Sequence, residues 1–139
     1  MRLYLDANPI IYSIEGVADF RLEALGWIER AEAEDGVVIT SRISRLECRV
    51  KPVRDGNTEL LERFDGFFAR PIVDLVEVSP EVIEHATMLR ATHNFKAPDA
   101  IHLASALVSN ADVFLTGDKN LSRCPGLTVE VLTGPRPVS

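Results

Sequence analysis

Short runs of apolar residues alternate along the chain with longer segments in which apolar residues recur every three or four positions. The short runs are typical of buried strands, and the longer spacing is typical of amphipathic helices. The pattern predicts strands at residues 2–5, 37–40, 72–78, 113–116 and 127–132. It predicts helices at residues 8–16, 19–34, 41–50, 57–69, 80–94 and 97–110, with Pro52 just beyond the end of the third helix.

Strands that alternate with helices indicate crossover connections between parallel strands, with helices covering both faces of the sheet. A chain of 139 residues is long enough for one domain and short for two. We therefore expect an α/β fold, a single-domain three-layer α/β/α sandwich with a mainly parallel central sheet, over residues 1–133. Residues 134–139 have the composition of a short C-terminal tail.

Charge and composition limit the classes of function that the chain can have. The chain carries 15 Lys and Arg against 21 Asp and Glu, a formal net charge of −6. Such a protein normally repels phosphate chains, unless clustered carboxylates hold divalent cations that supply positive charge locally. Apolar runs of no more than three residues predict neither a membrane span nor a signal peptide, so we expect a cytoplasmic protein with no membrane contact. Cys48 and Cys124 have no metal-binding spacing and are expected to be reduced.

Four acidic residues from separate segments, two after predicted strands and two on predicted helices, could converge at the carboxyl edge of the sheet, where parallel α/β folds bind their ligands. They are Asp6, Glu47, Asp99 and Asp118. Each also has a structural interpretation. The first is a possible helix N-cap, the second part of a capping box with Ser44, the third a helix-dipole partner and the fourth a turn residue. Chance explains a single acid near this edge of the sheet more easily than it explains four acids there.

The sequence segments that contain these four acids resemble those of a known protein family. Segments 5–8, 41–47, 98–104 and 115–118 follow the PIN-domain pattern in the order of that family. The chain resembles PIN-domain proteins over its whole length and, more narrowly, the VapC-type toxins, which are the ribonuclease halves of toxin–antitoxin pairs. The resemblance implies a PIN-like fold and an endoribonuclease that depends on Mg²⁺ or Mn²⁺.

The resemblance assigns catalysis and metal binding to the same four acids: Asp6, Glu47, Asp99 and Asp118. Asn8 and Thr116 stand at the polar positions that support the acids in the family, and Asn120 stands where some relatives carry a further acid. Oxygen ligands suit Mg²⁺ or Mn²⁺ better than zinc. In PIN relatives a water molecule attacks the phosphate, and the products carry a 3′-hydroxyl and a 5′-phosphate.

Basic residues are concentrated in one stretch of this acidic chain. Arg42, Arg45 and Arg49 share a helical stripe. Contact with RNA phosphates is one interpretation of this stripe. A solvated face, or salt bridges to protein carboxylates, is the other.

His102 lies three residues after Asp99 and therefore on the same helix face. We expect it to be a packed, hydrogen-bonded histidine beneath the site, in preference to a phosphate contact or a proton shuttle. His85 and His93 have no predicted role, and the three histidines have no zinc-type spacing.

The predicted helices at 8–16 and 57–69 hold more apolar residues than one face needs, which core packing explains for the most part. In the family, a groove between such helices receives an apolar segment of the antitoxin, and members commonly pair as homodimers. The resemblance therefore implies three partners: an RNA substrate, a cognate antitoxin protein and a second copy of the chain.

Two other functions stay open. A PIN fold that has lost catalysis and only binds a partner is one, although the presence of all four acids argues against it. A phosphoacceptor receiver domain is the other, because it also clusters acids at strand ends. That domain needs paired acids after its first strand and a lysine followed by proline after its last, whereas this chain has Asp6 alone and Lys119 followed by Asn120.

Overall fold

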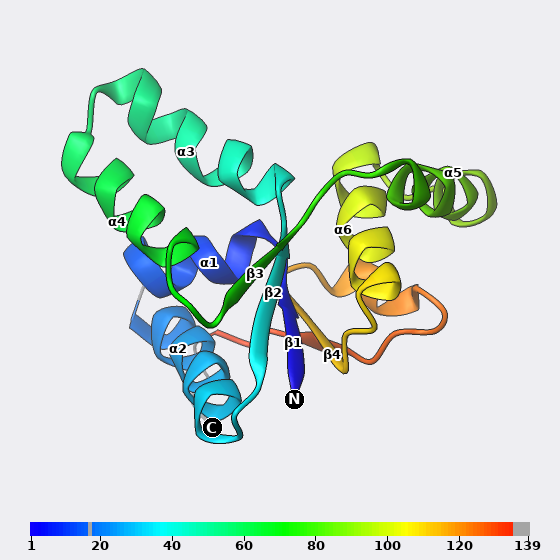
Figure 1. The fold of residues 1–139 in the computed structure, drawn as a ribbon, viewed down its shortest axis with the longest axis horizontal. Helices are drawn as coiled ribbons and strands as arrows, with labels where there is room; N and C mark the ends of the chain where they lie inside the picture. Colours follow the sequence, from blue (N-terminus) through cyan, green and yellow to red (C-terminus); the bar gives the residue numbers. More distant parts are fainter. Residues whose placement is uncertain (17, 135–139) are drawn as a thin grey trace.

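A parallel sheet runs through the middle of the molecule (Figure 1). The computed structural model describes residues 1–16 and 18–134. Within these residues, five strands pair side by side in the order β3-β2-β1-β4-β5, and every pair is parallel. The strands are β1 (Arg2–Leu5), β2 (Val37–Ser41), β3 (Val73–Val76), β4 (Val113–Thr116) and β5 (Val129–Val131).

Helices cover both faces of this sheet. One face carries α1 (Ala7–Glu15), α2 (Ala18–Ala33), α3 (Ile43–Asp55) and α4 (Thr58–Phe68). The other face carries α5 (Pro80–His93), α6 (Ala97–Val108) and the short 3₁₀ helix η1 (Lys119–Arg123). The predicted three-layer α/β/α sandwich is confirmed, and the sheet is parallel throughout the described chain.

The core is divided by the sheet into two clusters. Successive side chains of a strand point to opposite faces, so Leu3 and Leu5 of β1 join the cluster under α1–α4 while Tyr4 joins the cluster under α5 and α6. All three side chains are fully buried. This two-sided burial is the physical reason that the central strands β1 and β4 have apolar side chains on both faces, whereas the edge strands β3 and β5 each carry an exposed acid.

The sequence-based prediction that α3 ends before Pro52 is wrong. The helix continues through Pro52 to Asp55 and ends at Gly56, whose φ of 67° lies in the left-handed region that glycine adopts without strain. Pro52 is buried, so packing offsets the hydrogen bond that a proline inside a helix removes. The sequence analysis also missed η1, which is a single short turn without apolar periodicity.

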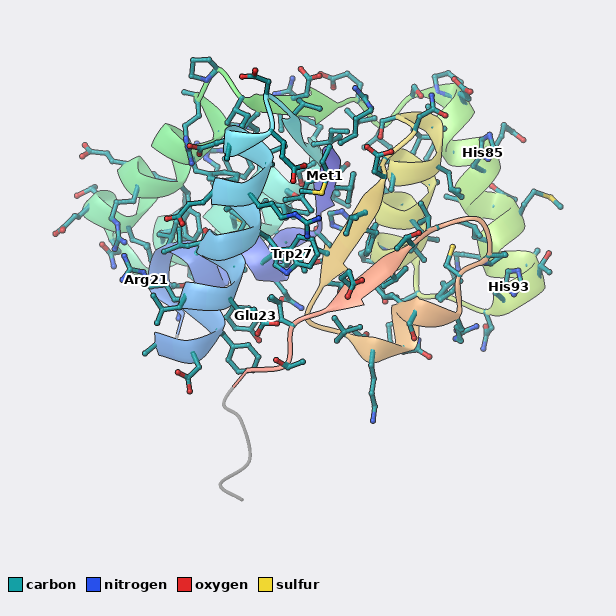
Figure 2. All side chains as sticks on the ribbon, turned by 90° about the horizontal axis from the view of Figure 1, so that it is seen from below. Met1, Arg21, Glu23, Trp27, His85 and His93 are labelled. Atoms are coloured by element: carbon teal, nitrogen blue, oxygen red, sulfur yellow. The ribbon has the colours of Figure 1, made fainter. Side chains whose placement is uncertain are left out.

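The chain that follows β5 is held against α2. The backbone N–H groups of Thr133 and Gly134 donate to the Glu23 carboxylate at 3.0 and 3.1 Å, and Figure 2 shows Glu23 beside this segment. Residues 135–139 of the predicted tail lie outside the described residues. Among the helices of the described chain, none combines the length and the apolar character that a membrane crossing requires.

The arm formed by α3 and α4 provides a stability test. Phe64 of α4 is 1% exposed and belongs to the core under α1–α4, whereas Leu46 of α3 is 66% exposed. We expect Phe64→Ala to lower the free energy of unfolding by about 3–5 kcal/mol, because it leaves a cavity in the core. The matched change Leu46→Ala should cost less than about 0.5 kcal/mol. Chemical denaturation measures both, and equal losses would contradict the packing of α4.

Candidate functional site

A small polar pocket lies at the carboxyl edge of the sheet, where the rule for parallel α/β folds places ligands. Its volume is about 50 Å³, and a single water molecule needs roughly 10–15 Å³ of such space. The pocket is lined by Asp6, Ala7, Asn8, Glu47, Asp99 and His102. Three of the four predicted acids, together with the predicted Asn8, therefore come together from β1, α1, α3 and α6.

Asp6 is the most deeply placed of these acids, because it directly follows the central strand β1 and is 4% exposed. Its Oδ2 atom accepts a hydrogen bond of 2.6 Å from the Thr116 hydroxyl at the end of β4. Its Oδ1 atom is buried and has no hydrogen-bond partner among the described residues. Asp6 occupies the N-cap position of α1, yet its side chain makes no capping bond, so a capping role does not account for it.

The electrostatics of the pocket disfavour negative charge. Burial raises the pKa of Asp6 from 3.8 to about 6, against the lowering effects of the Thr116 hydrogen bond, of His102 and of the nearby backbone N–H of Asn8. Burial also raises the pKa of the half-buried Asp99, and the negative charge of Asp118 adds to this shift. Ionised carboxylates here cost free energy, which a cation in the pocket would recover.

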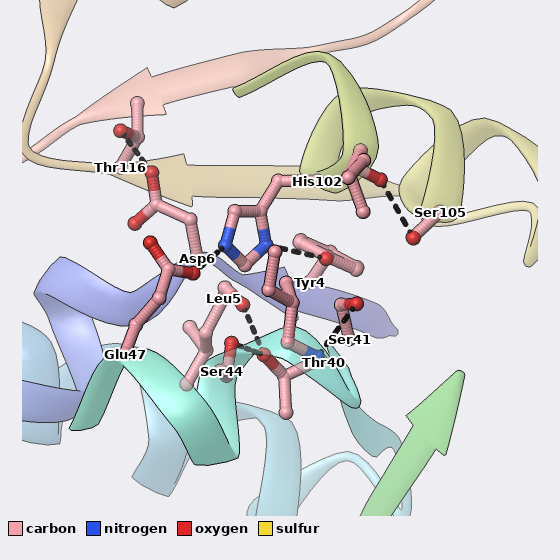
Figure 3. A network of polar contacts seen from close by, with 12 residues as sticks. Tyr4, Leu5, Asp6, Thr40, Ser41, Ser44, Glu47, His102, Ser105 and Thr116 are labelled. Atoms are coloured by element: carbon pink, nitrogen blue, oxygen red, sulfur yellow. Dashed lines mark hydrogen bonds and ion pairs between the residues drawn. The ribbon is translucent and has the colours of Figure 1, made fainter. Parts of the chain in front are cut away.

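Glu47 is held by a histidine. Its Oε1 atom lies 2.6 Å from Nε2 of His102, whose Nδ1 atom lies 2.8 Å from the Tyr4 hydroxyl (Figure 3). The capping-box interpretation of Glu47 is wrong, because α3 begins at Ile43 and the Ser44 hydroxyl contacts Thr40 instead. The expectation of a packed, hydrogen-bonded His102 is confirmed. Sequence analysis did not single out Tyr4, because a tyrosine within a buried apolar strand gives no sign that its hydroxyl has a partner in the site.

Asp118 lies beside the pocket and is not among its lining residues. Its Oδ1 atom accepts from the backbone N–H of Asn120 at 2.9 Å and caps η1, as its structural interpretation predicts. Its own backbone N–H donates to the Thr116 hydroxyl at 3.0 Å. Asp118 therefore contributes to the site through its charge on Asp99 and through the placement of Thr116.

The donor set fits a hard divalent cation. Within residues 1–16 and 18–134, no three Asp, Glu, His or Cys side chains already converge on one ion position. Mg²⁺, however, is usually bound through one or two carboxylates and keeps several of its waters. Asp6 offers an unpartnered buried oxygen, and Asp99 and Glu47 line the same pocket. These residues match that requirement.

The histidines and cysteines, which could supply nitrogen or sulfur ligands, are dispersed over the fold and do not gather as the acids do. Figure 2 shows His85 and His93 on α5, whereas His102 lies in α6 with both ring nitrogens engaged. Cys48 and Cys124 are buried free thiols, and burial raises the pKa of Cys48 to about 12. Their placement gives no support to a zinc site.

All three arginines of the predicted basic stripe have carboxylate partners within the chain. Arg42 pairs with Glu77 at 2.6 Å, and Arg45 and Arg49 pair with Asp65 at 3.6 and 2.8 Å. The same face of α3 carries three exposed apolar residues that sequence analysis did not single out: Leu46, Val50 and Val53. Together they line an open groove of about 570 Å³ on α3. Helical periodicity places residues on one face but does not show what covers it.

Comparison with known proteins assigns the chain to a family. The sequence model of the PIN-domain family matches residues 3–127, so the chain belongs to the PIN-domain family. No curated protein sequence matches the chain.

Solved structures agree on the fold. VapBC2 of Rickettsia felis, bound to a promoter DNA fragment, contains a chain with a TM-score of 0.78 and 19% identity, covering 94% of this chain and 98% of that chain. A toxin–antitoxin complex of Klebsiella pneumoniae gives a TM-score of 0.73 and 23% identity, with 96% and 99% covered. VapC20 of Mycobacterium tuberculosis, a toxin that cleaves the sarcin–ricin loop, gives 0.71 and 17%, with 96% and 99% covered. At these identities the likeness shows the fold.

The raised pKa of Asp6 predicts how stability depends on pH without metal. The folded protein binds this proton more tightly than the unfolded chain, so the contribution is complete below about pH 4 and is lost as pH rises through about 6. A shift of this size corresponds to about 3 kcal/mol. Asp6→Asn should remove it, because an amide does not titrate.

Chemical denaturation in EDTA between pH 4 and 7.5 measures this effect. We expect the unfolding free energy of the wild type, taken relative to Asp6→Asn, to fall across the window set by the two pKa values of Asp6, 3.8 unfolded and about 6 folded. Subtracting the variant removes the contributions of the other titrating groups. Parallel curves for the two proteins would show that Asp6 is not a buried titrating acid.

Proposed function

We propose that this chain is a metal-dependent endoribonuclease toxin of the VapC type, which hydrolyses RNA phosphodiesters and is neutralised by a cognate antitoxin. Mg²⁺ or Mn²⁺ is the proposed cofactor. Asp6, Glu47, Asp99 and Asp118 are the proposed catalytic and metal-site acids, with Asn8 and Thr116 in support.

One observation carries this proposal. The Oδ1 atom of Asp6 is buried without a hydrogen-bond partner in a pocket that Asp99 and Glu47 also line. A buried carboxylate oxygen left without a partner costs several kcal/mol, which folded proteins normally avoid. A divalent cation in the pocket would supply the missing partner, and the Thr116 hydroxyl fixes the orientation of the other oxygen.

The chemistry follows from the donor set. A divalent cation polarises the scissile phosphate and lowers the pKa of a bound water molecule. The residues of the chain provide the frame for this step. Asp6 and Asp99 hold negative charge on two sides of the pocket, and Glu47, oriented by His102, is placed to accept a proton from an attacking water. Asp118 adds negative charge beside Asp99.

The partners rest on similarity and on one surface of the molecule. The similar chains from Rickettsia felis and Klebsiella pneumoniae come from toxin–antitoxin complexes, which supports an antitoxin partner here. The apolar face of α3, formed by Leu46, Val50 and Val53, is exposed in the single chain, and exposed apolar patches mark protein contacts. A homodimer is part of the same proposal.

Arg42, Arg45 and Arg49 remain proposed contacts to the RNA backbone. Arg42 and Glu77 form an exposed pair, and such pairs contribute little to stability, so an RNA phosphate can replace Glu77 as the partner of Arg42 at small cost. Arg45 and Arg49 share the half-buried Asp65 as their partner.

Catalysis gives the direct test of this function. Purified protein should cleave bacterial RNA with Mg²⁺ or Mn²⁺ and lose this activity in EDTA. Asp6→Asn and Asp99→Asn should each lower the cleavage rate by at least about a hundredfold, because each removes a carboxylate from the metal site. Gel-resolved cleavage under single-turnover conditions measures the rates.

Asp74→Asn is the matched control, since Asp74 is an exposed aspartate on β3 and should retain the wild-type rate. Undiminished cleavage in excess EDTA would refute the metal-dependent mechanism. Equal rates for all three variants would refute the assignment of the acids. A wild type that cleaves no RNA but binds an antitoxin would favour the catalytically silent binding module.

A further inference from the structure

We infer that His102 is a positioning residue that holds Glu47 over the acidic pocket, as the middle member of a buried Tyr4–His102–Glu47 hydrogen-bond chain. The inference rests on the proposed function, because it concerns Glu47 as an acid of the metal site.

The chain of contacts joins two layers of the fold. His102 projects from α6 on one face of the sheet, and Glu47 projects from α3, which packs with the opposite layer. The contact between them, 2.6 Å from Nε2 to Oε1, spans the pocket at the end of β1. Within the described part of the chain, no other side chain hydrogen-bonds the Glu47 carboxylate.

Glu47 needs such a partner to keep one orientation. Its side chain is 29% exposed, and a free glutamate on a helix samples several rotamers, so fixing one of them costs conformational entropy. Thr116 fixes Asp6 in the same way, through a hydroxyl that donates to one carboxylate oxygen. His102 supplies the equivalent restraint for the acid that comes from α3.

His102 is itself rigid. The residue is 2% exposed, and its Nδ1 atom lies 2.8 Å from the hydroxyl of the fully buried Tyr4. The Tyr4 ring stacks on Phe114, with ring centroids 5.1 Å apart, and meets the imidazole edge-on at 5.9 Å. The restraint on Glu47 is thus anchored in the hydrophobic core under α6.

The donor and acceptor groups of Tyr4, His102 and Glu47 determine the direction of the two hydrogen bonds that join them. A carboxylate oxygen accepts hydrogen bonds, so we assign the proton of the His102–Glu47 contact to Nε2 of His102. In the neutral ring Nδ1 is then an acceptor, and the Tyr4 hydroxyl donates to it. Both ring nitrogens are occupied, so neither is left to contact a phosphate. His102 acts through Glu47.

Two substitutions separate this role from simple packing. The side-chain amide in His102→Asn reaches the position of Nδ1, so it keeps a partner for Tyr4 and loses the donor to Glu47. The longer amide in His102→Gln reaches the position of Nε2 and keeps that donor. Second-sphere hydrogen bonds in metal sites are worth roughly 10–100-fold in metal affinity.

The experiment measures Mn²⁺ binding by isothermal titration to the full-length chain, with a double-mutant cycle and single-turnover RNA cleavage alongside. We expect His102→Asn to weaken Mn²⁺ binding about tenfold and His102→Gln to stay within about threefold of wild type. In a Glu47→Gln background, His102→Asn should cause little further loss, because the residue acts through Glu47. Thermal melting in EDTA monitors folding of each variant.

Three results would overturn the positioning role of His102 while leaving the proposed function standing. These are unchanged Mn²⁺ affinity in His102→Asn, a loss that is fully additive with Glu47→Gln, and a wild-type imidazole that long-range ¹H–¹⁵N spectra show protonated on Nδ1 alone. A wild type that binds no Mn²⁺ and cleaves no RNA would overturn the proposed function, and this role with it. Wild-type binding with unchanged affinity in His102→Asn would overturn the positioning role alone.

Discussion

The burial of one carboxylate governs the rest of the site. Asp6 follows the central strand β1, so the fold places its charge where water is largely excluded. Removing a charge from water is costly unless partners replace the lost hydration. Burial raises the pKa of Asp6 to about 6, although the Thr116 hydroxyl donates to one of its oxygens. The other oxygen is left without a partner. The fold thus keeps a poorly compensated acid at the point where Asp99 and Glu47 also arrive.

The site exists because the three layers meet at one edge of the sheet. Asp6 directly follows strand β1 of the sheet, Glu47 lies in α3 of one helical layer, and Asp99 and His102 lie in α6 of the other. Each layer packs on its own core cluster. The Tyr4–His102–Glu47 chain is a polar link between the layers at this edge.

Local pattern predicted most of the fold, and tertiary contact decided the remainder. Alternating strands and helices predicted a parallel sheet, which in turn placed Asp6 and Asp99 at one edge. The helix break at Pro52 was wrong because buried packing overrides a local preference. Tyr4 escaped prediction because its partner His102 lies 98 positions away. The internal ion pairs of Arg45 and Arg49 with Asp65 likewise depend on how α3 packs on α4.

The claim that these acids form a divalent-cation site is tested most directly by melting curves of wild type and Asp99→Asn, each in EDTA and in Mn²⁺. Mn²⁺ at a hundredfold excess over its dissociation constant should stabilise the wild type by about 2.7 kcal/mol. Because burial and the Asp118 charge raise the pKa of Asp99, the variant should melt higher than wild type in EDTA and gain little from Mn²⁺. A variant that melts lower in EDTA and keeps the full Mn²⁺ response would contradict the account.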